Sequence, residues 1–314
     1  MKRTWLGSFG IVTAMVGLGA LSATAQTPAA KPKANAQGKA WTMPRTPDGH
    51  PDISGIWSHN AATPLERPKE LAGRATLTDE ELASLKRNAA ELFNGETDAA
   101  FGDSVFLAAL RSAKGDKSFT STDTTGNYNH FWLVDRQFDN RTSLVNDPPD
   151  GRIPALTPEY QKKRAERMAF TKQHQYDAPE NIALGLRCIT GNVPMIGAGY
   201  NNYYQIAQAA DFVAVNMEMR HDTRMIPLDA RKHPTQAIKH WLGSPSGRWE
   251  GDTLVVESRN FKDDAAFRID GDENMHLTER FTRVAADTLK YEVTVEDPTV
   301  YTKPCTATLF MKKE

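Results

Sequence analysis

The stretch from Leu289 to Glu296 alternates apolar and polar side chains at every step. Its apolar members are Leu289, Tyr291, Val293 and Val295, and its polar members are Lys290, Glu292, Thr294 and Glu296. Successive side chains of a β-strand point to opposite faces, so this pattern predicts a strand with one packed face and one wet face. A single strand is not stable alone, and the pattern therefore commits this part of the chain to a sheet.

Five further segments of the second half share the signals of a strand. They are rich in β-branched and aromatic residues, they are separated by turn-forming residues, and they comprise Tyr203–Gln208, Phe212–Met219, Arg224–Leu228, Thr253–Ser258 and His276–Val284. Residues 250–252 and 285–287 are short enough to be hairpin connections. So many consecutive antiparallel strands favour a meander over residues 200–314 that curls into an open or closed barrel. We therefore expect a mainly β (α+β) fold.

Residues 45–199 carry a different pattern, one of short helices and long loops. Thr78 and Glu81 form a capping box ahead of leucines at helical spacing. A second helix is predicted over 157–171, with proline at its first helical position. We expect this region to form an N-terminal arm that packs on the barrel, with the indole of Trp57 buried.

The first 25 residues have the three parts of a cleavable export signal. Lys2 and Arg3 supply the charged start, an apolar run of about 16 residues follows, and Ala23-Thr24-Ala25 offers the small-x-small pattern that signal peptidase cuts. A membrane anchor is the alternative, but the run is shorter than the roughly 20 residues of a spanning helix. We expect cleavage after Ala25, a disordered leader over 26–44, and a soluble periplasmic or secreted protein without a stable membrane anchor.

Charge and cysteine content limit the partners and the chemistry. The whole chain has a formal net charge of −1, and loss of Lys2 and Arg3 with the signal brings it to −3. This balance leaves no basic excess, which argues against a nucleic-acid partner. The two cysteines, Cys188 and Cys305, could form a disulfide in an oxidising compartment or remain separate thiols.

The densest group of polar residues in the second half runs from Glu218 to Arg224, between two apolar strands. A strand that ends in such a group places it at a barrel rim, where small barrels form their ligand sites. His221 could act as a general acid or base, oriented by Asp222 or Glu218. Arg224 could hold an anionic or enolate-like oxygen of a substrate. The alternative is a charged hairpin whose ion pairs lie on the surface.

A second candidate pair, His276 and Glu279, lies on the predicted strand 276–284. The two residues differ in parity, so only one of them can point into a shared cavity. The face of His276 also carries Thr278, Arg280 and Thr282. That polar face is either exposed to solvent or lines a pocket. In a pocket, His276 would be a further catalytic residue and Arg280 would contact the substrate.

Two stretches rich in aromatic and amide side chains could bind a ligand. Their members with hydrogen-bonding groups and π faces are Asn129 and Trp132 in the first half, and Asn201, Asn202 and Tyr203 ahead of the first strong strand. Such side chains suit an aromatic or sugar-like molecule. The alternative for the second stretch is a turn followed by packed aromatic residues.

Several established catalytic motifs are absent from the sequence. It has no G-x-S-x-G elbow, no phosphate-binding loop, no dinucleotide fingerprint and no C-x-x-C-H haem attachment site. Its remaining histidines do not show H-x-x-x-H or H-x-H spacing on one element. We therefore expect neither a metal nor an organic cofactor.

Six stretches of the chain form longer motifs. They are YNHFW at 128–132, DPPDGRIP at 147–154, WLG at 241–243, GRWEGDTLVV at 247–256, LTERFTRV at 277–284 and YEVTVEDP at 291–298. Together they resemble a large, mostly uncharacterised family of exported proteins of acidobacteria and sphingomonad-type proteobacteria. The resemblance covers the chain from about Pro51 onward and implies export and a lipocalin-like β-sheet half, but no particular activity. The chain departs from the family pattern at Cys305, where relatives carry Trp.

Three functions fit these features. The favoured one is an exported lyase, isomerase or hydrolase that applies cofactor-independent acid/base chemistry to a small organic molecule. An aromatic molecule is one candidate for this substrate. The second is a lipocalin-like periplasmic binding or carrier protein without turnover. The third is a β-domain that binds a partner protein and exposes a large apolar patch. An enzyme is expected to place a histidine and a carboxylate in one cavity, whereas a carrier has an apolar cavity with few polar groups.

Overall fold

A computed structural model gives the fold of Trp41–Glu314 as one compact unit. It describes residues 41–93, 103–115, 136–190, 193–196, 202–229, 238–263 and 268–314. The predicted signal peptide and residues 26–40 of the predicted leader lie outside the described residues, as do the candidate contact residues Asn129, Trp132 and Asn201. None of the helices in the described part combines the length and the apolar character that a membrane crossing requires.

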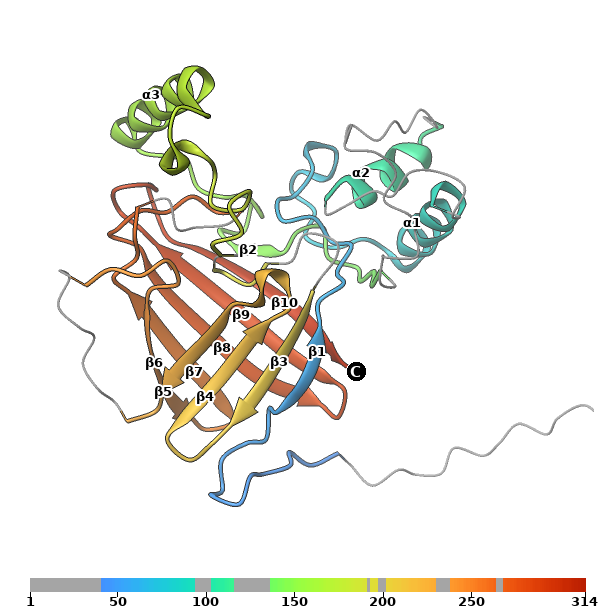
Figure 1. Ribbon diagram of the computed structural model, residues 1–314. Coiled ribbons are helices and arrows are strands. Elements are labelled where there is room, and N and C mark those ends of the chain that lie inside the picture. Colours follow the sequence, from blue (N-terminus) through green and yellow to red (C-terminus); the bar gives the residue numbers. More distant parts are fainter. Residues whose placement is uncertain are drawn as a thin grey trace, which may run out of the picture. The chain divides into compact units, whose positions relative to one another are not determined.

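Nine strands form a nearly closed antiparallel barrel (Figure 1). Their order around the barrel is β5, β4, β3, β1, β10, β9, β8, β7, β6, and a tenth strand, β2 (Val145–Asp147), pairs with β10. The bounds are β1 Gly55–Ser58, β3 Tyr203–Gln208, β4 Phe212–Met217, β5 Thr223–Pro227, β6 Ser244–Glu250, β7 Thr253–Arg259, β8 His276–Ala285, β9 Thr288–Glu296 and β10 Cys305–Lys313. The expected mainly β fold with a lipocalin-like barrel is confirmed.

The predicted meander does not close on itself, because a strand from the N-terminal arm lies between its two parts. β1 pairs with β3 on one side and with β10 on the other. Its Trp57 is fully buried, as expected, and the indole Nε1 donates a hydrogen bond to the carbonyl of Ile53 at 2.9 Å. The arm therefore contributes to the barrel wall as well as packing on it.

The strands at the two ends of this order, β5 and β6, face each other without a backbone ladder between their described residues. Every pairing from β5 round to β6 is antiparallel, and the eight reversals leave β5 and β6 running in the same direction. A Cβ added to Gly247 of β6 would stand 2.8 Å from Ile226 Cγ2 and 3.5 Å from the Pro227 carbonyl of β5. We call this parallel, side-chain-packed boundary the seam.

The barrel interior is filled largely by apolar side chains. The alternation predicted for 289–296 holds in β9, where the inward residues Leu289, Tyr291, Val293 and Val295 are at most 1% exposed. Segment 193–196 of the arm packs into the same core, and the Met195 N–H donates to Tyr291 Oη at 3.3 Å. Burial of this apolar surface is the main contribution to barrel stability.

The helices lie mostly in the arm. They are α1 Asp79–Leu92, α2 Asp103–Ser112 and α3 Pro158–His174, with short 3₁₀ turns η1 Lys69–Leu71, η3 Pro179–Asn181 and, between β4 and β5, η4 Met219–His221. The predicted capping box of α1 is present: the Thr78 hydroxyl accepts from the Glu81 N–H, and the Glu81 carboxylate accepts from the Thr78 N–H. α1 packs on α2 around the buried ring of Phe106 in a second apolar cluster.

Candidate functional site

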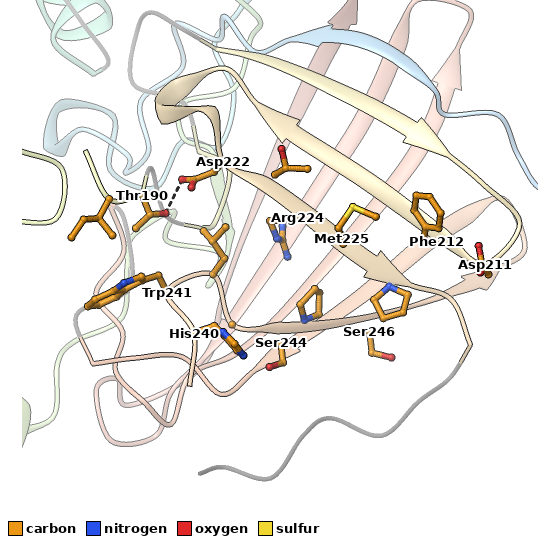
Figure 2. A pocket seen from close by; sticks show the side chains of 16 residues that line it. Thr190, Asp211, Phe212, Asp222, Arg224, Met225, His240, Trp241, Ser244 and Ser246 are labelled. Atoms are coloured by element: carbon orange, nitrogen blue, oxygen red, sulfur yellow. Dashed lines mark hydrogen bonds between the residues drawn. The ribbon is translucent and has the colours of Figure 1, made fainter. Parts of the chain in front are cut away.

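A pocket of about 700 Å³ lies along the seam, and we call it the seam pocket (Figure 2). Figure 2 shows Asp222 and Thr190 hydrogen-bonded at one end and Asp211 and Phe212 at the other. Its apolar wall includes Phe212, Met225, Trp241 and Leu242, and its polar wall includes Thr190, Asp222, Arg224, His240 and Ser244. A cleft of this size with mixed apolar and polar walls is typical of a small-molecule site.

The turn before β6 supplies His240 and Trp241. Its backbone is tied to the residues that follow β7: the His240 N–H donates to the Asn260 carbonyl at 2.9 Å, and the His240 carbonyl accepts from the Lys262 N–H at 3.0 Å. The Lys262 ammonium lies 4.6 Å from the centre of the Trp241 ring. These contacts hold an exposed imidazole and a half-buried indole at the wall of the pocket.

Asp222 reaches the pocket from the turn between β4 and β5. In that turn Arg220 and His221 both have positive φ, 61° and 59°, which is uncommon for residues with side chains. The Asp222 carboxylate accepts a hydrogen bond from the Thr190 hydroxyl at 2.7 Å. The imidazole of His221 is exposed and is not among the residues that line the seam pocket. Of the predicted cluster, the fold brings Asp222, Thr223 and Arg224 to the pocket.

Arg224 lines the pocket and also belongs to a polar network inside the barrel. Its Nη1 and Nη2 donate to Oε1 and Oε2 of Glu279 on β8, at 2.8 and 2.5 Å, and Nη2 also donates to Ser258 Oγ at 3.1 Å. Tyr291 Oη donates to the same carboxylate at 2.8 Å. The Arg224 and Glu279 side chains are at most 1% exposed.

The protonation of Arg224 and Tyr291 in this network follows from burial and from the Glu279 side chain next to them. Burial by itself lowers the pKa of Arg224, but the adjacent Glu279 carboxylate outweighs burial, and the pKa is raised overall. Burial, reinforced by the same carboxylate, raises the pKa of Tyr291 well above its ordinary value, so its hydroxyl stays protonated and donates. Arg224 is therefore a fixed cation at the inner side of the seam.

Glu218 and Tyr203 lie next to each other, away from the pocket. The Tyr203 N–H donates to Glu218 Oε2 at 3.3 Å, and the Glu218 N–H donates to the Tyr203 carbonyl at 2.9 Å. Asn202 is buried, and its carbonyl accepts from the His59 N–H at 3.0 Å. None of these three candidate residues lines the seam pocket. Their roles in catalysis or substrate contact stay predictions.

His276 and Arg280 lie on the outer face of β8. His276 Nδ1 is 3.2 Å from Glu296, and Arg280 is 3.0 Å from Glu250. Glu279 is an odd number of residues from His276 on the same strand, so its side chain points to the opposite, inward face. The polar face of this strand thus takes part in ion pairs on the outside of the barrel, and neither His276 nor Arg280 reaches the seam pocket.

The two cysteines are separate free thiols. Cys305 is buried at the start of β10, where burial raises the pKa of its thiol to about 12. Cys188 is exposed. The disulfide that the sequence left open is therefore not formed, because one thiol is packed in the core while the other faces solvent.

Most residues of the pocket and network were not among the predicted site residues, including His240, Trp241, Ser258 and Tyr291. A signal for the network was nevertheless present, because Glu279 is a charged residue at an apolar position of an alternating strand. His240 lies in a turn without periodicity, and no sequence pattern connects it to Asp222.

Within the described residues, no group of three or more His, Cys, Asp or Glu side chains is arranged to hold a metal ion. Neither a family model nor a curated protein matches the chain. The resemblance to a family of exported proteins therefore stays a prediction, and the seam pocket carries what can be inferred about function.

Proposed function

We propose that the chain is an exported enzyme that binds a small organic molecule in the seam pocket and applies cofactor-independent acid/base chemistry to it. One observation carries the proposal: an imidazole, that of His240, and a carboxylate, that of Asp222, line a single pocket beside the aromatic ring of Trp241. Imidazole and carboxylate groups are the usual proton-transfer groups of enzymes near neutral pH.

The apolar part of the pocket favours a flat ligand. The Trp241 indole offers a π face, and the thioether of Met225 adapts to irregular shapes. Met225 is 52% exposed, so a large apolar side chain is open to water at the pocket wall. A ligand with an aromatic or similarly flat body would cover both side chains and gain from removing their surface from water.

The polar groups suggest a division of roles. His240 lines the pocket, so we assign to it the acid/base role that was predicted for His221. Asp222, positioned by Thr190, would accept a proton or orient a substrate hydroxyl. Arg224 supplies a fixed positive charge at the inner side of the pocket, which would favour a carbonyl or anionic oxygen of the substrate on that side.

A periplasmic carrier protein without turnover is the second candidate. It is favoured by the hydrogen bond that Asp222 already accepts from Thr190, because a carboxylate engaged in this way accepts a proton less readily. Both candidates use the same pocket, and they differ in whether the bound molecule is converted.

The first experiment identifies a ligand and tests the pocket. The full chain is expressed with its signal, and compounds retained on the purified protein are identified by mass spectrometry. In parallel, benzoate, phenol and 4-hydroxybenzaldehyde are screened by thermal shift. We expect a compound that raises Tm for the native protein and has no effect on the Trp241→Ala variant. A Tm rise that Trp241→Ala leaves unchanged would place the ligand elsewhere and overturn the pocket assignment.

The second experiment separates enzyme from carrier, with conversion of that compound followed by NMR. His240→Ala is expected to keep binding and to lose conversion by about 10²-fold or more. His174→Ala, which removes an exposed histidine on α3, serves as the matched control and keeps full activity. No conversion by the native protein would contradict the enzyme proposal and leave the carrier function, whereas full conversion by His240→Ala would contradict the catalytic role of His240.

Export is tested separately. Cell fractionation and N-terminal sequencing are expected to find a periplasmic or secreted chain that starts at Gln26. A chain that retains Met1 in the cytoplasm would contradict the proposal.

A further inference from the structure

One end of the seam pocket is formed by a short turn of the arm, residues 183–190, which follows α3 and η3 in the chain. Within this turn the Ile189 N–H donates a hydrogen bond to the Leu184 carbonyl at 3.2 Å. Ile189 and Thr190 line the pocket, and Figure 2 shows Thr190 at the end where Asp222 lies. The 183–190 turn is therefore a piece of the pocket wall that belongs to no strand.

Side-chain hydrogen bonds tie the 183–190 turn to the turn of η4, which connects β4 with β5. Nε and Nη2 of Arg220 donate to the Gly185 carbonyl at 3.3 and 3.2 Å. The Thr190 hydroxyl donates to Asp222 Oδ2 at 2.7 Å. Arg220 and Asp222 lie two residues apart, so a movement of the 183–190 turn away from the barrel breaks both contacts. Together these contacts hold the turn against the pocket.

The contact made by Arg220 depends on a close approach and on an unusual backbone. A Cβ added to Gly185 would stand 2.8 Å from Arg220 Nη2, so glycine permits the guanidinium to come this near. Arg220 and His221 have φ of 61° and 59°, values that residues with side chains disfavour. Strained residues of this kind cluster at ligand clamps and switch regions, where surrounding contacts keep the strain in place. The η4 turn is therefore a segment that can relax when the contact is released.

Much of the 183–190 turn is open to solvent between its two attachment points. Leu184 is buried, but Leu186 is 69% exposed and Cys188 is exposed as well. Segments that bury few apolar side chains open locally at a much lower free energy than the strands of a folded core. The turn can therefore leave the pocket while the barrel stays folded.

We propose that the 183–190 turn is a lid of the seam pocket and that it opens to admit the ligand. In the closed lid, Arg220 holds Gly185 and Thr190 holds Asp222. Opening breaks these bonds and removes the Thr190 hydroxyl from Asp222 Oδ2, so a carboxylate that Thr190 engages gains a route to contact with a substrate. The lid rests on the proposed function, because it takes the seam pocket as the ligand site.

Trypsin cleavage after Arg187 measures lid opening without any ligand, because a protease cuts a segment only when it has left the folded structure. Arg220→Gln is expected to speed this cleavage about tenfold, since it removes the charge-assisted hydrogen bonds to Gly185. Arg111→Gln, which removes an exposed arginine of α2, is the matched control and leaves the rate at Arg187 unchanged. Mass spectrometry assigns each cleavage site.

Variants of Thr190 test the second attachment point and separate local opening from misfolding. Thr190→Val keeps the shape of the side chain and removes the donor to Asp222, whereas Thr190→Ser keeps the donor. We expect cleavage after Arg187 to be about tenfold faster in Thr190→Val and unchanged in Thr190→Ser. Native cleavage rates in both Arg220→Gln and Thr190→Val would overturn the lid. An equal increase at Arg87 of α1 in both variants would report global unfolding and would overturn it as well.

Ligand kinetics then test the role of the lid in binding, with 4-hydroxybenzaldehyde as the probe and stopped-flow quenching of tryptophan fluorescence as the signal. We expect Arg220→Gln to raise the association and dissociation rates about tenfold each, so that Kd changes less than either rate. Unchanged rates alongside faster cleavage would overturn the role of the lid in ligand entry. No binding of the probe to native protein or variant would contradict the proposed function and, with it, that role. A Tm rise that requires Trp241, combined with native cleavage rates in the lid variants, would leave the proposed function intact and overturn the lid alone.

Discussion

Arg224 on β5 and Glu279 on β8 form a two-point ion pair inside the barrel, with N···O distances of 2.8 and 2.5 Å. β5 is one of the two strands at the seam, where the described residues form no backbone ladder. Through this pair, and through the bond from Arg224 to Ser258 on β7, the edge strand is tied to strands on the far side of β6. We interpret the pair as a side-chain link that closes the barrel where backbone hydrogen bonds do not.

Removing one partner of this pair is expected to destabilise the protein strongly. Glu279→Gln leaves the Arg224 charge buried without its counter-ion, and loss of one partner of a buried pair reduces the free energy of unfolding by about 3–5 kcal/mol. Urea unfolding measures the change. Glu292→Gln, at a half-buried glutamate on the outer face of β9, is the control and should lose about 1 kcal/mol or less.

The same pair can be tested by replacing both partners. The double variant Arg224→Met with Glu279→Leu removes both charges together, so it is expected to recover most of the stability that Glu279→Gln loses. If the double variant is as unstable as Glu279→Gln, the loss comes from packing rather than from an uncompensated buried charge.

His59 is expected to make stability depend on pH. Burial, with smaller effects of Arg268 and Arg141, lowers the pKa of His59 from 6.5 to about 3 in the folded state. Between these values the unfolded chain binds a proton that the folded chain does not, so stability falls as the pH is lowered from about 6.5 toward 3. The slope from this group is limited to about 1.4 kcal/mol per pH unit.

Urea unfolding from pH 7 to pH 4 measures this dependence. His59→Gln is expected to flatten the stability curve in that window, and His221→Gln, at an exposed histidine that forms no ion pair with a described residue, serves as the control. An equal slope in the native protein and in His59→Gln would show that another group causes the acid loss.

Gly243 is expected to be required at the end of the turn that carries His240 and Trp241. Its φ is +68°, and a Cβ there would stand 2.7 Å from the ring of Phe261. Gly251, in the turn between β6 and β7, has a similar φ of +60° but nothing within 4 Å of the added Cβ. Gly251→Ala should therefore lose about 1 kcal/mol from backbone strain alone.

Gly243→Ala should lose about 1–3 kcal/mol more than Gly251→Ala, because it adds overpacking to the same strain. It should also weaken the binding of any ligand that contacts Trp241, because the turn that carries this residue must shift. Thermal unfolding and the thermal-shift response to the ligand measure the two effects. Equal losses in the two alanine variants would show that Phe261 moves aside without cost.

The cysteines should react very differently in the folded protein. Cys188 is exposed, whereas the Cys305 thiol is buried and its pKa is raised to about 12, so it holds little reactive thiolate at neutral pH. We expect one thiol per chain to be alkylated quickly at pH 7.5 and two after unfolding in urea, as counted by mass spectrometry. A chain without reactive thiols that gains two after reduction would instead contain the disulfide.

Strands with two unlike faces made the barrel predictable. The strict alternation of β9 comes from one buried and one wet face, and the capping box of α1 needs only residues three positions apart. β6 was not predicted, because its opening residues Ser244-Pro245-Ser246-Gly247 interrupt the strand pattern with proline and glycine. At an edge beside the seam these residues are tolerated, and Gly247 provides the close approach to β5.

The sequence alone predicts local features, namely strands with a packed and a wet face and capped helices. The choice of neighbouring strands, the entry of β1 into the barrel, the parallel meeting of β5 and β6 and the inward position of Glu279 depend on the three-dimensional packing. His240, Trp241 and Asp222 line one pocket because the fold brings two separate turns to that seam. Periodicity reports which way a side chain points, whereas contacts between distant segments depend on the packing of the whole barrel.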